Sequence, residues 1–146
     1  MNRPTEVSCS EQGQSLVEFA ACLVILLVLL AGIVDGGRAL FTYMSLRDAA
    51  QEGALFGSTN PTAVAAIESR VRNSSNLLQS LSSDPGANTT INVTVVGSAC
   101  TGGGITVRVN YTNFPLTMPF LGVLIGNQTV GISASVTDTI LSPACH

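Results

Sequence analysis

An uninterrupted apolar segment near the N-terminus constrains this chain more than any other feature. Phe19–Val34 contains sixteen residues and no charged one. Extended back through Glu18 to Leu16, the segment has nineteen residues and would measure about 28 Å as a helix. That length nearly matches the roughly 30 Å hydrocarbon core of a bilayer. Because a chain of 146 residues is too short to bury such a helix on all sides, we predict one membrane span over residues 16–34.

The composition excludes several classes of function. Only 10% of the residues are charged, against about 25% in an average soluble domain. A net charge of −3, with no lysine, excludes a nucleic-acid-binding protein that works through a basic face. The single histidine is the last residue, His146, which argues against histidine-based catalysis and against a metal site made of histidines. Since no nucleophile or acid–base constellation stands out either, we expect no enzyme activity, no cofactor and no metal.

Glu18 does not fit the apolar segment, because a carboxylate inside a span is costly and by default marks a function. Gly13 stands five residues before it, giving Gly-x-x-x-x-Glu directly ahead of the long apolar helix. This pattern resembles the processing site of type IV prepilins, which implies that a prepilin peptidase cuts between Gly13 and Gln14. In that family the new α-ammonium group, here of Gln14, can neutralise the glutamate of a neighbouring subunit and set the helix register. The plainer alternative is that Gly13 is a linker residue and that the side chain of Glu18 extends to the lipid headgroups.

The residues after the span extend the resemblance. Gly13–Gly57 is similar to the TadE-like family, the pseudopilins or minor pilins of the tight-adherence (Flp) pilus apparatus. The residues that carry the likeness are Gly13, Glu18, Phe19, Gly32–Asp35, Gly37–Ala39, Ala49–Ala50 and Glu52–Ala54. Two positions depart from the family pattern: Val24 stands where proline is common, and Leu55 where arginine often follows.

The resemblance implies a structural protein of an adhesive Tad pilus. Its location would be the bacterial inner membrane, single-pass with an extracytoplasmic C-terminal domain, and the cell-surface pilus after assembly. The implied partners are the prepilin peptidase, other pilin or pseudopilin subunits and the inner-membrane assembly platform, besides the lipid bilayer. Glu18 and Phe19 would serve subunit assembly. A different class stays open: an uncleaved single-span anchor that presents a ligand-binding or adhesin ectodomain.

The resemblance implies a leader over residues 1–13, and the hydrophobic pattern predicts a helix over 14–57 followed by a domain over 58–146. Within the helix, small and apolar residues recur at helical spacing at Ala39, Tyr43, Leu46, Ala50, Gly53 and Gly57. This stripe suits packing on the protein's own domain and packing on another helix of a filament equally well. A second helix is predicted over 61–81, with Asn60 as its N-cap and Pro61 as its first residue.

Beyond residue 85 the apolar residues alternate with polar ones in three runs, centred on Val93, Val107 and Ile132. We therefore predict an α+β fold, in which the long helix precedes one helix packed on a three-stranded (or larger) antiparallel sheet. In this meander the second helix would cover the apolar face of the sheet. The apolar connection Phe114–Ile125 would either cap the core or form a patch for another subunit or the membrane.

Cys100 follows the first predicted strand and Cys145 the third, which places both at the same end of a meander. A disulfide between them would contribute about 4 kcal/mol in the chain-entropy model and would require an oxidising compartment. The alternative is a pair of free thiols.

Overall fold

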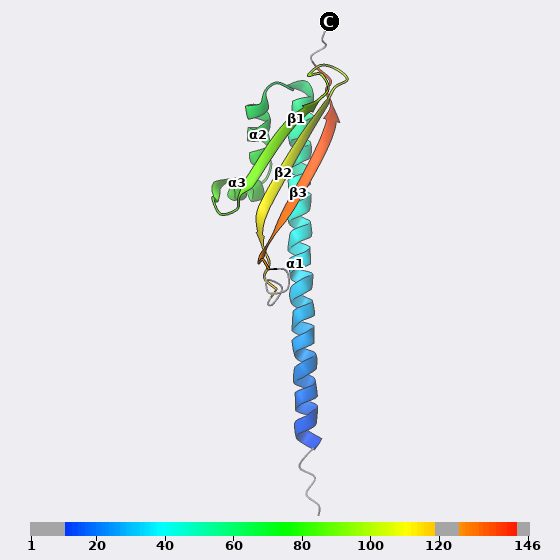
Figure 1. Cartoon of the computed structure of the whole chain (residues 1–146), viewed down its shortest axis with the longest axis vertical. Coiled ribbons are helices and arrows are strands. Elements are labelled where there is room, and N and C mark those ends of the chain that lie inside the picture. Colours follow the sequence, from blue (N-terminus) through cyan, green and yellow to red (C-terminus); the bar gives the residue numbers. More distant parts are fainter. Residues whose placement is uncertain (1–10, 119–125, 143–146) are drawn as a thin grey trace, which may run out of the picture.

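The computed structural model describes residues 11–118 and 126–142, and Figure 1 shows its elements. They are α1 (Glu11–Thr59), α2 (Val64–Arg72), α3 (Asn76–Ser83), β1 (Thr89–Val96), β2 (Gly104–Pro115) and β3 (Thr129–Thr139). The sheet and the two short helices pack around the C-terminal part of α1, while its N-terminal part projects away from them. The predicted α+β fold is confirmed.

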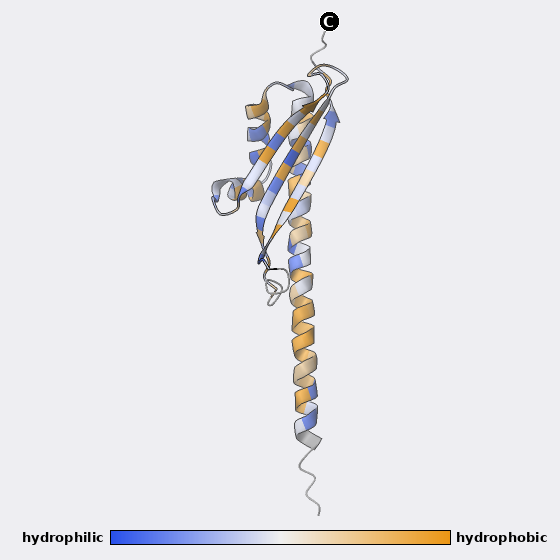
Figure 2. Cartoon of the chain, viewed as in Figure 1, coloured by the Kyte–Doolittle hydropathy of each residue, from blue (hydrophilic) through white to orange (hydrophobic). Residues whose placement is uncertain are grey.

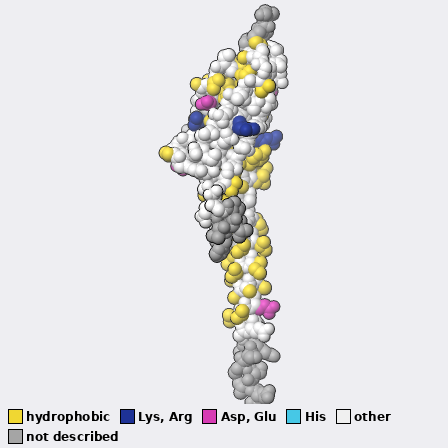
Figure 3. Space-filling view, viewed as in Figure 1, with side chains coloured by type: hydrophobic (Ala, Val, Ile, Leu, Met, Phe, Trp, Pro, Cys, Tyr) yellow, Lys and Arg dark blue, Asp and Glu magenta, His cyan; other side chains and the backbone are white. Residues whose placement is uncertain are grey.

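Helix α1 has 49 residues, which corresponds to a length of about 74 Å. Its N-terminal half is apolar and lies outside the folded domain, as Figures 2 and 3 show. An 18-residue window of the helix has a mean hydropathy of 2.9, and none of that window is buried. Phe19, for example, is 68% exposed and Ile33 is 70% exposed. The helix is therefore long and apolar enough to cross a membrane, as expected for a membrane-anchored protein.

The sheet is an antiparallel meander in the order β1-β2-β3. Val107 in the central strand faces Val93 of β1 on one side and Val136 of β3 on the other. The predicted two-residue alternation is correct, because Ile105, Val107 and Val109 are fully buried. The register shifts between Tyr111 and Phe114, at the end of the sheet nearest the apolar half of α1.

The prediction of a single helix over residues 61–81 was wrong. The chain forms α2 and α3 instead, and Ser75 caps α3 by accepting the backbone N–H of Leu78 at 3.2 Å. Asn73 ends α2, where its side-chain amide donates to the carbonyl of Ser69 at 2.9 Å. Short polar side chains of this kind compete for backbone groups and so interrupt a helix.

Asn60 is not an N-cap. Its side-chain amide donates to the carbonyl of Phe56, at the C-terminal end of α1, over 3.4 Å. Residues 61 and 62 form a turn, and α2 begins at Val64 after Ala63, which provides no side-chain cap. The proline therefore separates two helices instead of opening the second.

The sheet packs mainly on α1 and not, as predicted, on the second helix. Strands β2 and β3 lie against α1, and α2 contacts β1. The small residues of the helical stripe make this approach possible: a Cβ on Gly57 would lie 2.6 Å from Cδ1 of Ile105. Leu46 and Ala50 are fully buried, whereas Tyr43 is 43% exposed. The C-terminal part of the stripe thus packs on the protein's own domain.

Candidate functional site

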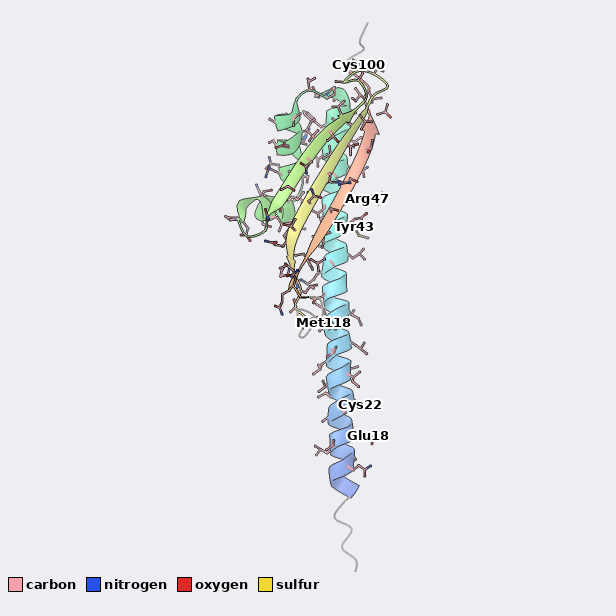
Figure 4. The ribbon with its side chains drawn as sticks, in the orientation of Figure 1. Glu18, Cys22, Tyr43, Arg47, Cys100 and Met118 are labelled. Carbon is pink, nitrogen blue, oxygen red and sulfur yellow. The ribbon has the colours of Figure 1, made fainter. Side chains whose placement is uncertain are left out.

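The predicted processing site lies at the free end of α1, remote from the sheet. Gly13 lies in the first turns of the helix, where a Cβ would meet no atom within 4 Å. Gln14, Glu18 and Phe19 are all exposed, and Figure 4 shows Glu18 pointing away from the helix. Within the described residues, Glu18 forms no ion pair. Cleavage after Gly13 would require this first turn to open, as helix ends readily do.

The two strand ends that precede the predicted disulfide lie side by side. The N–H of Gly102 donates to the carbonyl of Ile140 at 3.0 Å, and the N–H of Ile140 donates to the carbonyl of Gly103 at 2.8 Å. Cys100 is half-buried in this loop, at the end of the domain far from the apolar half of α1 (Figure 4). Cys145 lies outside the described residues, so the pairing stays a prediction. Cys22 is an exposed free thiol on the apolar half of α1.

The structure also brings together a buried polar cluster that sequence reasoning missed. Asp35 comes directly after the predicted span and is only 5% exposed. Its Oδ2 accepts the backbone N–H groups of Thr117 at 2.7 Å and Met118 at 2.6 Å. These two residues lie in the connection that follows β2, and Figure 4 shows Met118 beside α1. Asp35 therefore ties that connection to α1, immediately after the span.

Arg38 completes this cluster. Its Nη1 donates to Oγ1 of Thr117 at 2.6 Å and to Oδ1 of Asp35 at 3.4 Å. Its guanidinium carbon lies 5.4 Å from the centre of the Phe114 ring, a cation–π distance. The sequence held two signals for Asp35 and Arg38: both belong to the TadE-like pattern, and they are a carboxylate and a cation three residues apart at the end of an apolar segment.

The surroundings of Asp35 act on its pKa in opposite directions. Burial alone would raise the pKa. Hydrogen bonds from the backbone N–H of Met118 and from the side chain and backbone N–H of Thr117 lower it, and so does the positive charge of Arg38. The net result is a pKa below the ordinary value of 3.8, so the carboxylate is charged at neutral pH. A charged acceptor forms stronger hydrogen bonds than a neutral one, so the ionised Asp35 holds the N–H groups of Thr117 and Met118 more strongly.

Of the apolar connection Phe114–Ile125, residues 119–125 lie outside the described part of the chain. Phe114 is 4% exposed, and Leu116 packs against the core. The start of the connection thus caps the core, as one of the two predictions had it.

A groove of about 540 Å³ opens beside the Asp35–Arg38 cluster. It lies between α1 on one side and α3 and the end of β2 on the other. Its lining consists of Val34, Gly37, Arg38, Phe41, Thr42, Leu77, Leu81, Tyr111, Phe114 and Pro115. The groove therefore combines apolar walls with one guanidinium group.

The comparisons with known proteins agree with the sequence analysis. Residues 13–55 match the family model of the TadE-like proteins, a range that includes the apolar half of α1, Asp35, Arg38 and most of the small-residue stripe. No curated protein and no solved structure is significantly similar to the chain. The predicted resemblance is confirmed over this part of the chain: residues 13–55, most of the long N-terminal helix, are similar to the TadE-like proteins.

Proposed function

We propose that the protein is a minor pilin or pseudopilin of an adhesive Tad pilus, processed by a prepilin peptidase between Gly13 and Gln14. The leader would be residues 1–13, and the mature chain would keep α1 from Gln14 onward as a bilayer anchor, with an extracytoplasmic domain over 58–146. The observation that carries this proposal is the exposed apolar half of α1, which follows the Gly13–Glu18 pattern and continues without a break into the domain.

The charge distribution supports a role for processing. Residues 14–37 contain no lysine or arginine, so Arg38, about 30 Å along the helix from Glu18, is the first cationic side chain of the mature chain. Cleavage would remove Arg3 and create an α-ammonium group on Gln14, about 6 Å along the helix from Glu18. We infer that this group, on a neighbouring subunit, pairs with Glu18 during assembly. Because the pair would lie in a weakly screening environment, its attraction would be strong.

The substitution Glu18→Gln in the full chain tests the pairing, in cells that express the complete pilus apparatus. We expect normal amounts of the variant in membranes but a loss of at least about tenfold in sheared fibres, which corresponds to about 1.4 kcal/mol. The matched control is Glu18→Asp, which keeps the charge. Wild-type incorporation of Glu18→Gln would overturn the pairing, and loss from membranes would point to insertion instead of assembly.

Structural assembly, not catalysis, is the activity proposed for the domain. The partners would be other pilin or pseudopilin subunits and the inner-membrane assembly platform. A disulfide between Cys100 and Cys145 belongs to this proposal, since an extracytoplasmic domain would fold in an oxidising compartment.

A further inference from the structure

The groove beside Asp35 and Arg38 continues the lipid-facing surface of α1. Val34 is the last residue of the apolar segment, lines the groove and is 58% exposed. Phe41, two turns further along, lines it too and is 64% exposed. Leu77 and Leu81 of α3 form the opposite wall and are half-buried. An apolar ligand that entered from the membrane could therefore slide from the span into the groove without crossing water.

The depth of Arg38 places it among lipid headgroups. It follows Val34 by four residues, about 6 Å along the helix axis. A bilayer measures about 40–45 Å with its polar layers and about 30 Å without them, which leaves about 5–7 Å for each layer. This placement holds whichever way the chain crosses the membrane.

Arg38 has hydrogen-bond donors to spare. Both of its hydrogen bonds use Nη1, and residues 11–118 and 126–142 offer no acceptor to the three N–H groups on Nε and Nη2. Its side chain is 46% exposed. Asp35 neutralises it only in part, because Oδ2 of that carboxylate accepts two backbone N–H groups. A planar guanidinium with free donors matches the paired oxygens of a phosphate.

We propose that this groove binds one glycerophospholipid molecule, whose phosphate contacts Arg38 and whose acyl chain lies along the walls formed by α1 and α3. The proposal requires a membrane span and does not depend on pilus function. A free phosphate would leave the apolar walls in water, whereas an acyl chain would cover them. The bound lipid would fix the domain against the membrane surface at the point where Asp35 already ties β2 to α1.

Two neighbouring glycines provide a matched test. Gly37 lines the groove and Gly36 does not, yet a Cβ at either position would meet no atom within 4 Å. The substitution Gly37→Leu would fill the groove while leaving the Arg38 contacts intact. Gly36→Leu makes the same chemical change outside the groove. Both replace glycine by a better helix former, so neither is expected to destabilise α1.

The experiment reconstitutes the full chain in phosphatidylcholine–phosphatidylglycerol vesicles and then counts retained phospholipids by native mass spectrometry. We expect one retained phospholipid on the wild type and on Gly36→Leu, and at least about tenfold less on Gly37→Leu and Arg38→Gln, or about 1.4 kcal/mol. Unchanged hydrogen exchange in β2 would show that each variant is folded.

Three results would overturn the proposal. The first is equal retention by Gly37→Leu and the wild type. The second is loss of the lipid in favour of added inorganic phosphate, which would make the site a phosphate site only. The third is a wild-type dimer that Gly37→Leu abolishes, which would make a second copy of the chain the occupant.

Discussion

Adding a single methyl group at Gly53 tests whether α1 is the central packing element of the domain. A Cβ at this position would overlap Cγ2 of Val71 and would lie 3.3 Å from Cγ1 of Val107. Both valines are fully buried and have stiff side chains, so neither can move away cheaply. Alanine gains about 0.8–1.0 kcal/mol over glycine in a helix, but overpacking costs about 1–3 kcal/mol. Because one contact is an overlap, we place the cost near the top of that range.

The substitution Gly53→Ala should therefore destabilise the domain by about 1–2 kcal/mol, the difference between these two effects. Hydrogen exchange of the full chain in micelles measures it: amides of β2 should exchange about 5–30 times faster. The control is Gly36→Ala, which meets no atom within 4 Å and should leave β2 exchange unchanged. Slower exchange in Gly53→Ala would refute the reasoning, since helix propensity would then outweigh packing.

The remaining predictions concern three separate contacts. Because the pKa of Asp35 lies below 3.8, its contribution to stability is complete at neutral pH and is lost as the pH falls through that lowered pKa. A carboxyl ¹³C titration midpoint above 3.8 would contradict this. If Cys100 and Cys145 are paired, Cys100→Ser should cost about 4 kcal/mol in denaturant unfolding under oxidising conditions and nothing under reducing ones. Equal stability in both conditions would count against the pairing. Ser75→Ala should cost about 1 kcal/mol by removing the cap on Leu78, measured as faster exchange of that amide, with Ser80→Ala as the control. An unchanged Leu78 amide would contradict the assigned cap.

Features that depend on neighbouring residues could be predicted from the sequence. The span follows from an unbroken apolar run, and each strand follows from an alternation that must place one face inward. The meander follows because short connections between successive strands favour antiparallel neighbours. Even the closeness of the strand ends beside Cys100 follows from this topology.

Features that depend on distant residues could not be predicted. Asp35 and the N–H groups of Thr117 and Met118 are 82 and 83 positions apart, and no local pattern signals that they meet. The small-residue stripe on α1 suits a sheet and a neighbouring helix alike, so only the tertiary structure separates them. The break at Ser75 depended on a local competition for backbone groups that helical periodicity does not register.

We propose that this chain is a processed pilus subunit, and the identity of its mature N-terminus is the most direct test of that proposal. Intact mass and N-terminal sequencing of the protein from native membranes and sheared fibres provide that identity. We expect a terminus at Gln14, with residues 1–13 removed. A mature protein that still begins at Met1 would contradict the account and favour an uncleaved membrane anchor that presents a binding domain.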